Sequence, residues 1–232
     1  MSQAGVVTWL AVRELWITFR LVILLLALVA VGAIVALVPA SLPATMQRLA
    51  IGMGAASLVV AAVTAWSVAE ERQQGRAGWL VTRSVPRGTL LGGWFVALSA
   101  VVLAGTIATG ILGWLAASGV SLRLDPTAYA VRFGAVAATV VAVVALGVLA
   151  GTLGRPRVAA LLAVILAAAS GLLAWLVPAA PGMIPGAAFV ELAALVEGTT
   201  SHVVAWQSAG VALVAAAVLL GLARLALERA DL

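Results

Sequence analysis

FGAVAATVVAVVALGVLAGTL, residues 133–153, is an apolar run without a charged side chain. A helix needs roughly 20 apolar residues to cross a bilayer. Further candidate spans cover residues 17–38, 49–69, 89–117, 158–177 and 203–223. The runs are continuous in Ala, Leu and Val and lack the alternation of barrel strands, so they predict six transmembrane helices.

The composition also favours lipid as the solvent of this chain. Of its 232 residues, 65% are hydrophobic and 9% are charged, and the mean hydropathy is +1.22. No soluble domain of this size can hide so much apolar surface. We therefore predict an all-α integral membrane protein with a single transmembrane domain, residues 1–232. The first run is too long for a signal peptide and should remain as a helix.

The net charge of +5 does not indicate a nucleic-acid partner, because the arginines follow a membrane topology. With a cytoplasmic N-terminus, the outer segments hold only Arg48, Arg123 and Arg132. The positive-inside rule then predicts a multi-pass plasma-membrane protein with both termini in the cytoplasm. The inner arginines are Arg13, Arg20, Arg72, Arg76, Arg83, Arg87, Arg155, Arg157, Arg224 and Arg229.

Residues that could carry catalysis are few. The chain has no cysteine, no lysine and a single histidine, His202. Without lysine it has no Walker loop of its own, and the residues do not suggest a metal site. No ionisable residue lies near the centre of the second to sixth spans, which argues against an ion-coupled carrier. We expect no catalytic activity and no bound cofactor.

An amphipathic segment, residues 5–16, precedes the first span. Trp9, Arg13, Trp16 and Arg20 are spaced to share one helical face. Tryptophan and arginine suit the headgroup layer, so we predict a helix lying on the inner membrane surface. The alternative is that the first span starts early and carries an aromatic anchor.

EERQQGRAGWLVTRSVPRG, residues 70–88, is the longest charged interruption of the chain. Trp79 and Leu80 stand among its arginines and glutamates, as an apolar anchor with a charged rim would. Glutamates at the start and Pro86 near the end are compatible with a rigid helix. The alternative is that these arginines only set the topology.

The outer segment, residues 178–202, is too broken for a span, yet AAFVELAALVE within it predicts a short helix. We predict a re-entrant hairpin, with an ordinary loop as the alternative. Glu191 and Glu197 do not share a helical face, and a solvated loop surface is the expectation for both. A role in gating is the alternative.

Small residues mark two of the spans. Gly147 and Gly151 form a GxxxG pair, and Gly105, Thr109 and Gly113 follow one side of the third span. Small residues let helices approach closely. We expect them to pack helices within the subunit, and a dimer face is the alternative.

The loop contains a recognisable spacing. Glu71 and Gly75 form E-x-x-x-G, and Leu80, Val85 and Arg87 follow. With Gly93 at the start of the next span, this pattern and the layout of the whole chain resemble the ABC-2 type permease subunits of ATP-driven exporters. Departures from the family pattern are Arg76 for Thr, Ser84 for Pro and Trp94 for Lys, with Pro86 two positions beyond the usual proline.

The resemblance implies a coupling helix in this loop that docks on a separate ABC ATPase subunit, which would bind ATP and Mg²⁺. A second permease subunit, identical or related, would complete the translocation path. The implied lining, from the first, second and fifth spans, is rich in Ala, Leu and Val with occasional Ser57, Thr64 and Ser170, and this composition favours an apolar or amphipathic cargo over a sugar or an ion. The implied coupling residues are Glu70, Glu71, Arg72, Gly75, Arg76, Trp79, Leu80, Arg83 and Arg87.

Two other functions stay open at this point. A haem-exporter-like permease of cytochrome c maturation shares this size and layout. A non-transporting membrane scaffold or immunity protein is also compatible with the residues. An intramembrane hydrolase or transferase lacks the polar groups that it would need.

Overall fold

The computed structural model describes residues 3–38, 40–74, 86–120, 124–177, 182–197 and 202–229. Throughout these residues the regular secondary structure is helical. The elements are α1 (Gln3–Ile17), α2 (Arg20–Leu37), α3 (Leu42–Gln73), α5 (Arg87–Val120), α6 (Pro126–Leu153), α7 (Pro156–Leu176), α8 (Ala187–Ala193), the 3-10 helix η1 (Ala194–Glu197) and α9 (His202–Arg229).

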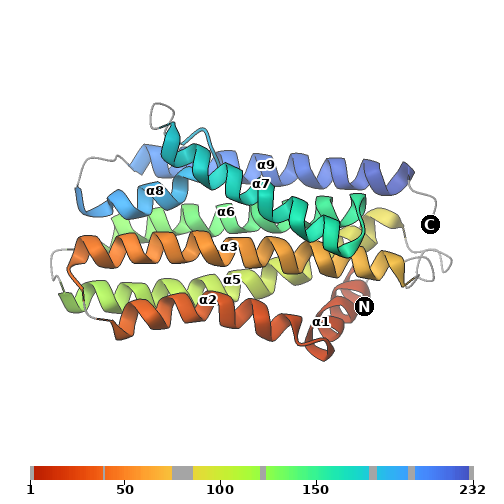
Figure 1. Ribbon diagram of the computed structural model, residues 1–232, viewed down its shortest axis with the longest axis horizontal. Helices are drawn as coiled ribbons and strands as arrows, with labels where there is room; N and C mark the ends of the chain where they lie inside the picture. The colour runs from red at the N-terminus through yellow and green to blue at the C-terminus, as the bar shows by residue number, and fades with distance from the viewer. Residues whose placement is uncertain are drawn as a thin grey trace.

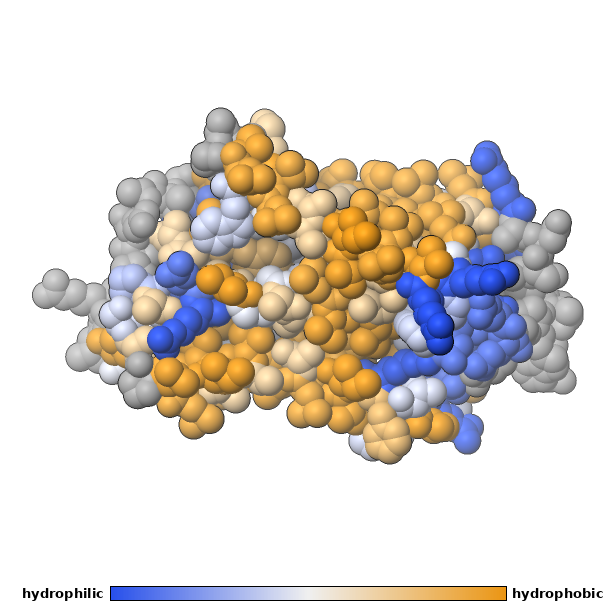
Figure 2. Space-filling view, viewed as in Figure 1, coloured by the Kyte–Doolittle hydropathy of each residue, from blue (hydrophilic) through white to orange (hydrophobic). Residues whose placement is uncertain are grey.

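Six helices, α2, α3, α5, α6, α7 and α9, are long and apolar enough to cross a membrane. They run along the long axis of the molecule, with both termini at one end and α8 at the other (Figure 1). Figure 2 shows apolar surface across the middle and hydrophilic residues gathered toward the two ends. The prediction of an all-α fold with six candidate membrane helices is confirmed.

Prolines lie in the first turn of three membrane helices, α3, α6 and α7. Pro43 opens α3 and Pro126 opens α6, where a missing N–H costs no helical hydrogen bond. Asp125 caps α6, and its Oδ1 accepts a hydrogen bond of 3.0 Å from the Thr127 N–H. Both of the helices α3 and α6 begin before residues 49 and 133, where the expected spans start.

α6 is the central helix of the bundle, and it packs against α3, α5, α7 and α9. Its most apolar window is 67% buried, against 22% for both α7 and α9. A Cβ placed on Gly147 would lie 2.7 Å from Thr64 Cβ and 3.1 Å from the Ala61 carbonyl oxygen. Gly147 and Gly151 therefore pack α6 closely against α3, which confirms the expected use of the GxxxG pair within the subunit.

The chain turns sharply between α1 and α2. Phe19 adopts the left-handed conformation with φ 58°, and the Thr18 hydroxyl donates to the Glu14 carbonyl at 2.8 Å. α1 crosses the end of the bundle at a steep angle (Figure 1). Arg20 consequently begins α2, so the prediction that it shares one continuous helical face with Trp9 is wrong.

Trp9 and Trp16 are exposed on α1, and the Arg13 guanidinium lies over the Trp9 ring at 5.6 Å from its centroid. The opposite face buries Val7 and two further apolar residues toward α5. This arrangement suits a helix at a headgroup layer. The position of α1 in that layer stays a prediction.

Replacing Gly147 by alanine should destabilise the protein by about 1–3 kcal/mol, because the added methyl group overlaps the Thr64 side chain. Gly134 is the matched control on the same helix, since a Cβ there meets nothing within 4 Å. The measurement is the free energy of unfolding of each purified variant in detergent. Equal stability of Gly147→Ala and Gly134→Ala would contradict the close packing of α6 on α3.

Candidate functional site

The predicted coupling loop joins the C-terminal end of α3 to the N-terminal end of α5. Glu70, Glu71 and Arg72 lie in the last turns of α3, and Arg87 is the first residue of α5. These positions lie at the end of the molecule that also holds both termini (Figure 1). The other predicted coupling residues, Gly75, Arg76, Trp79, Leu80 and Arg83, lie outside the described residues.

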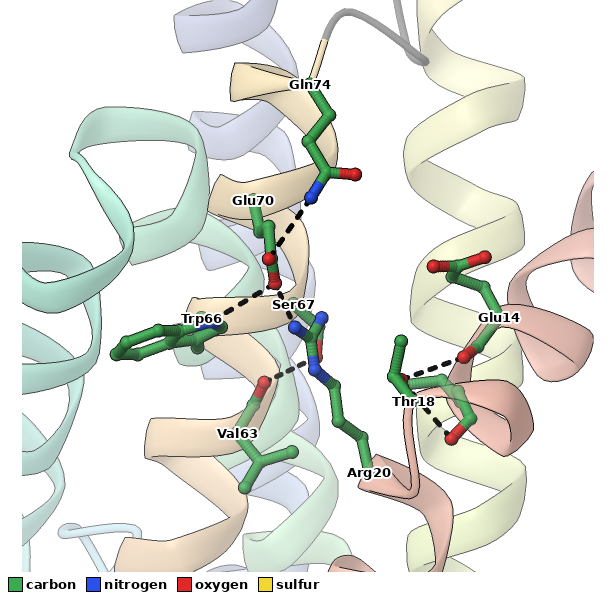
Figure 3. Close-up of polar contacts among 9 residues, drawn as sticks. Glu14, Thr18, Arg20, Val63, Trp66, Ser67, Glu70 and Gln74 are labelled. Carbon is green, nitrogen blue, oxygen red and sulfur yellow. Dashed lines mark hydrogen bonds and ion pairs between the residues drawn. The ribbon is translucent and has the colours of Figure 1, made fainter.

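Glu70 is the centre of a polar cluster that joins α2 to α3. Its Oε2 forms an ion pair with Arg20, reaching across from the start of α2 (Figure 3). The same oxygen accepts a hydrogen bond of 3.2 Å from Trp66 Nε1, and Oε1 accepts one of 3.1 Å from Gln74 Nε2. The Arg20 and Glu70 side chains are only 17% and 30% exposed. A partly buried, charge-assisted pair of this kind fixes the relative position of two helices.

Arg72 and Arg87 bind the C-terminal ends of two other helices. Arg72 Nη1 donates to the Thr152 carbonyl near the end of α6. Arg87 Nη1 donates to the carbonyls of Leu227 at 2.9 Å and Glu228 at 3.2 Å, at the end of α9. The last carbonyls of a helix have no intrahelical donor and carry partial negative charge, so an arginine stabilises both.

A small cavity of about 30 Å³ lies where α3, α5, α6 and α9 meet, beside Glu71 and Arg72 at the end of α3. Its size suits about one water molecule. The cavity is mainly apolar, with Glu71 and Arg72 at its border. Its lining includes Val68, Glu71, Leu90, Trp94, Val148 and Leu227.

This geometry connects the loop mechanically to most of the bundle. Glu70 holds the end of α3 to α2, and Arg72 holds it to α6. Arg87 holds the start of α5 to α9. The residues that flank positions 75–85 thus bond to α2, α6 and α9.

The opposite end of the molecule contains a second pair of opposite charges. Glu191 on α8 is 5% exposed and Arg132 on α6 is 4% exposed, and their opposite charges interact. The expectation that Glu191 lies on a solvated loop surface is therefore wrong. The Glu197 side chain lies outside the described residues. The sequence offered one indication of this pair: Arg132 and Glu191 have opposite charges, apolar neighbours and the same predicted side of the membrane.

Two of the three hydroxyl residues expected in a transport path lie at a larger cavity of about 310 Å³. Ser57 of α3 and Ser170 of α7 line it, together with residues of α6, α8 and α9. Thr64 is instead fully buried beside Gly147. Spans 1, 2 and 5 were expected to line the path, whereas this cavity is formed by α3, α6, α7, α8 and α9.

Metal-binding potential can be judged for the described residues alone. Within them, no group of three or more His, Cys, Asp or Glu residues is placed to hold a metal ion. His202 is exposed at the start of α9.

Comparison with known proteins leaves the family open. No protein-family model matches the chain, and no curated protein matches it. The chain has the fold of a multi-pass helical membrane protein, and its resemblance to exporter permeases rests on the loop residues and the layout.

Replacing Glu70 by glutamine should lower the free energy of unfolding by about 2 kcal/mol, because Arg20 would lose its charged partner in a partly buried position. Glu228→Gln is the matched control, since it alters the exposed Arg224–Glu228 pair on α9. That change should cost less than about 0.5 kcal/mol. Denaturation of the purified variants in detergent measures both, and equal losses would refute the special role of Glu70.

Replacing Glu191 by leucine should cost about 3–5 kcal/mol, because it leaves the Arg132 guanidinium buried opposite an apolar side chain. The double variant Glu191→Leu with Arg132→Met removes both charges and should recover most of that loss. Unfolding in detergent provides the measurement. A double variant less stable than the single one would argue against a direct coupling of the two charges.

Proposed function

We propose that this chain is the membrane-spanning permease subunit of an ATP-driven ABC exporter. It works with a separate ABC ATPase subunit, which binds ATP and Mg²⁺, and with a second permease subunit. Its setting is the plasma membrane, with both termini and the loop of residues 70–88 in the cytoplasm. The chain itself is not an enzyme.

The observation that carries this proposal is the bonding of the residues around the loop. A coupling element must pass a displacement from a soluble partner to several membrane helices. Glu70 and Arg72 tie one end of the loop to α2 and α6, and Arg87 ties the other end to α9.

The sequence of the loop supports a protein partner. Residues 75–85 contain Arg76, Arg83 and the apolar pair Trp79 and Leu80. Tryptophan and arginine are the residues that most often dominate the energy of an interface. An apolar anchor surrounded by charge is typical of a contact between separately folded subunits.

The larger cavity supports the proposed class of cargo. None of its lining residues is charged, and most are Ala, Val, Leu or Gly. Such a lining favours an apolar or amphipathic molecule over a sugar or an ion.

Replacing Trp79 or Leu80 by aspartate should strongly weaken binding of the ATPase subunit while membrane insertion persists. The measurement is purification of the tagged full chain from its native membrane, with detection of a co-purifying ATPase that contains a Walker motif. Loss of an interface anchor costs at least about 2 kcal/mol, so recovery of the ATPase should fall about thirtyfold.

Arg155→Asp is the matched control, because it changes an exposed residue in the short turn between α6 and α7 at the same predicted membrane side. This variant should retain the ATPase. If Trp79→Asp and Leu80→Asp also retain it, or if no ATPase accompanies the unmodified chain, the proposed function is wrong. A non-transporting scaffold protein would purify without an ATPase.

A further inference from the structure

The cavity of about 310 Å³ has the size of a ligand site. Small-molecule pockets occupy roughly 300–1,000 Å³, and an apolar cavity of about 150 Å³ already holds benzene. The space exists because small residues stand at four lining positions on three helices. These positions are Ala142 on α6, Ala167 and Gly171 on α7, and Ala215 on α9.

The cavity lies beneath helices whose outer surfaces are apolar. α7 packs on α3 and α6, whereas α9 packs mainly on α6, so the two helices form opposite walls. Leu162 and Leu166 on α7 are 38% and 44% exposed, and Leu213 and Val218 on α9 are 54% and 56% exposed. The outer surfaces of both walls therefore suit the hydrocarbon of the bilayer, from which an apolar occupant would come.

The polar groups at the cavity make little demand on an occupant. The Ser57 hydroxyl donates to the Gly54 carbonyl at 2.6 Å, and the Thr139 hydroxyl lies 2.8 Å from the Pro185 carbonyl. Because the Ser57 and Thr139 hydroxyls already have backbone acceptors, neither of them needs a polar ligand.

The segment around α8 fixes one end of the cavity. Pro185, Gly186 and Phe189 contribute to the lining. A Cβ on Gly186 would lie 2.6 Å from the Ser170 carbonyl oxygen, so this segment packs directly on the backbone of α7. Two residues beyond Phe189, Glu191 interacts with Arg132 and holds α8 against α6. The cavity is thus a defined space with one closed end.

We propose that this cavity binds a hydrocarbon chain of a membrane amphiphile, which enters between α7 and α9 from the bilayer. The size, the uncharged lining, the two satisfied hydroxyls of Ser57 and Thr139 and the apolar outer surfaces of α7 and α9 all fit such a chain. Binding of the chain does not depend on an ATPase. Only the further assignment of the cavity as the place where cargo is held rests on the proposed function.

The test uses the full chain in phosphatidylcholine nanodiscs with a fatty acid that carries a photoreactive diazirine in its chain. Labelled residues are mapped by mass spectrometry. We expect labelling to concentrate on the cavity-lining parts of α6 and α7. Gly171→Leu should reduce labelling there at least fivefold, because the new side chain occupies the cavity. A Cβ at Gly171 meets nothing within 4 Å, so the fold should accommodate it.

Gly221→Leu on α9 is the matched control. It introduces the same side chain at an exposed glycine, where a Cβ likewise meets nothing within 4 Å, and Gly221 does not line the cavity. This variant should leave labelling unchanged. Ala215→Leu fills the cavity from the opposite wall and should repeat the loss. Two variants on different helices keep the test valid if one of them fails to fold.

The source of the chain is tested by a second probe, a diacyl phospholipid with the diazirine in one acyl chain. Cavity labelling by either probe supports the site and shows whether a single-chain or a two-chain amphiphile is preferred. Uniform labelling along the exposed faces of α7 and α9 would overturn the proposed cavity site. An unchanged labelling pattern in Gly171→Leu would also overturn it.

A second copy of the chain is the competing occupant. The sequence has no cysteine, so Gly171→Cys provides a single thiol at the cavity. Efficient cross-linking of two such chains would overturn the lipid site. If instead the cavity labels as expected but no ATPase co-purifies, the site stands and the proposed function fails.

Discussion

The arrangement of this protein depends on one constraint: a polar group in lipid must find its partner within the protein. Backbone groups meet it by forming helices. The charged side chains meet it by pairing near the ends of the bundle. Arg20 pairs with Glu70, Arg72 and Arg87 bind the carbonyls at helix ends, and the Arg132 and Glu191 charges interact. Each of these contacts joins two different helices, so the same groups that must be neutralised also set how the helices are placed.

Small residues complete the placement in the middle of the bundle, where charges are excluded. Lipid offers no hydrophobic driving force for helix association, so close packing must supply it. Gly147 and Gly151 bring α6 against α3. Alanines make the contact between α3 and α7, including Ala61, Ala65, Ala159 and Ala163. α6 also packs closely on α9 through Ala142, Ala145, Ala212 and Ala216.

The sequence predicts the elements well because lipid acts on local composition. Long apolar runs become helices and arginine-rich segments fall at one end, and neither outcome depends on contacts with distant parts of the chain. The break at Phe19 was not predictable in this way, because phenylalanine rarely adopts positive φ and neither glycine nor proline marks the turn. Consequently the sequence grouped Arg20 with α1, although its partner is Glu70 in another helix.

The partners of the site residues were equally hidden, because each contact joins residues far apart in the chain. Arg72 and Thr152 are 80 positions apart, and Arg87 and Leu227 are 140 apart. Helical periodicity reports only neighbours three or four residues away. The sequence therefore indicated that the arginines beside residues 75–85 matter, but not that Arg72 and Arg87 already bond to helices of the same chain. Burial of Glu191 was missed for the same reason, since Arg132 lies on a different helix.

These contacts place the loop and the larger cavity on the same helices. Arg72 holds the C-terminal end of α6, which forms the floor of the cavity, and Arg87 holds the C-terminal end of α9, which forms one wall. α7, the other wall, rests on α3 and α6 through alanines, whose smooth surfaces oppose sliding less than interlocked large side chains would. Arg72 and Arg87, which flank the loop, thus bond to two of the helices that line the cavity.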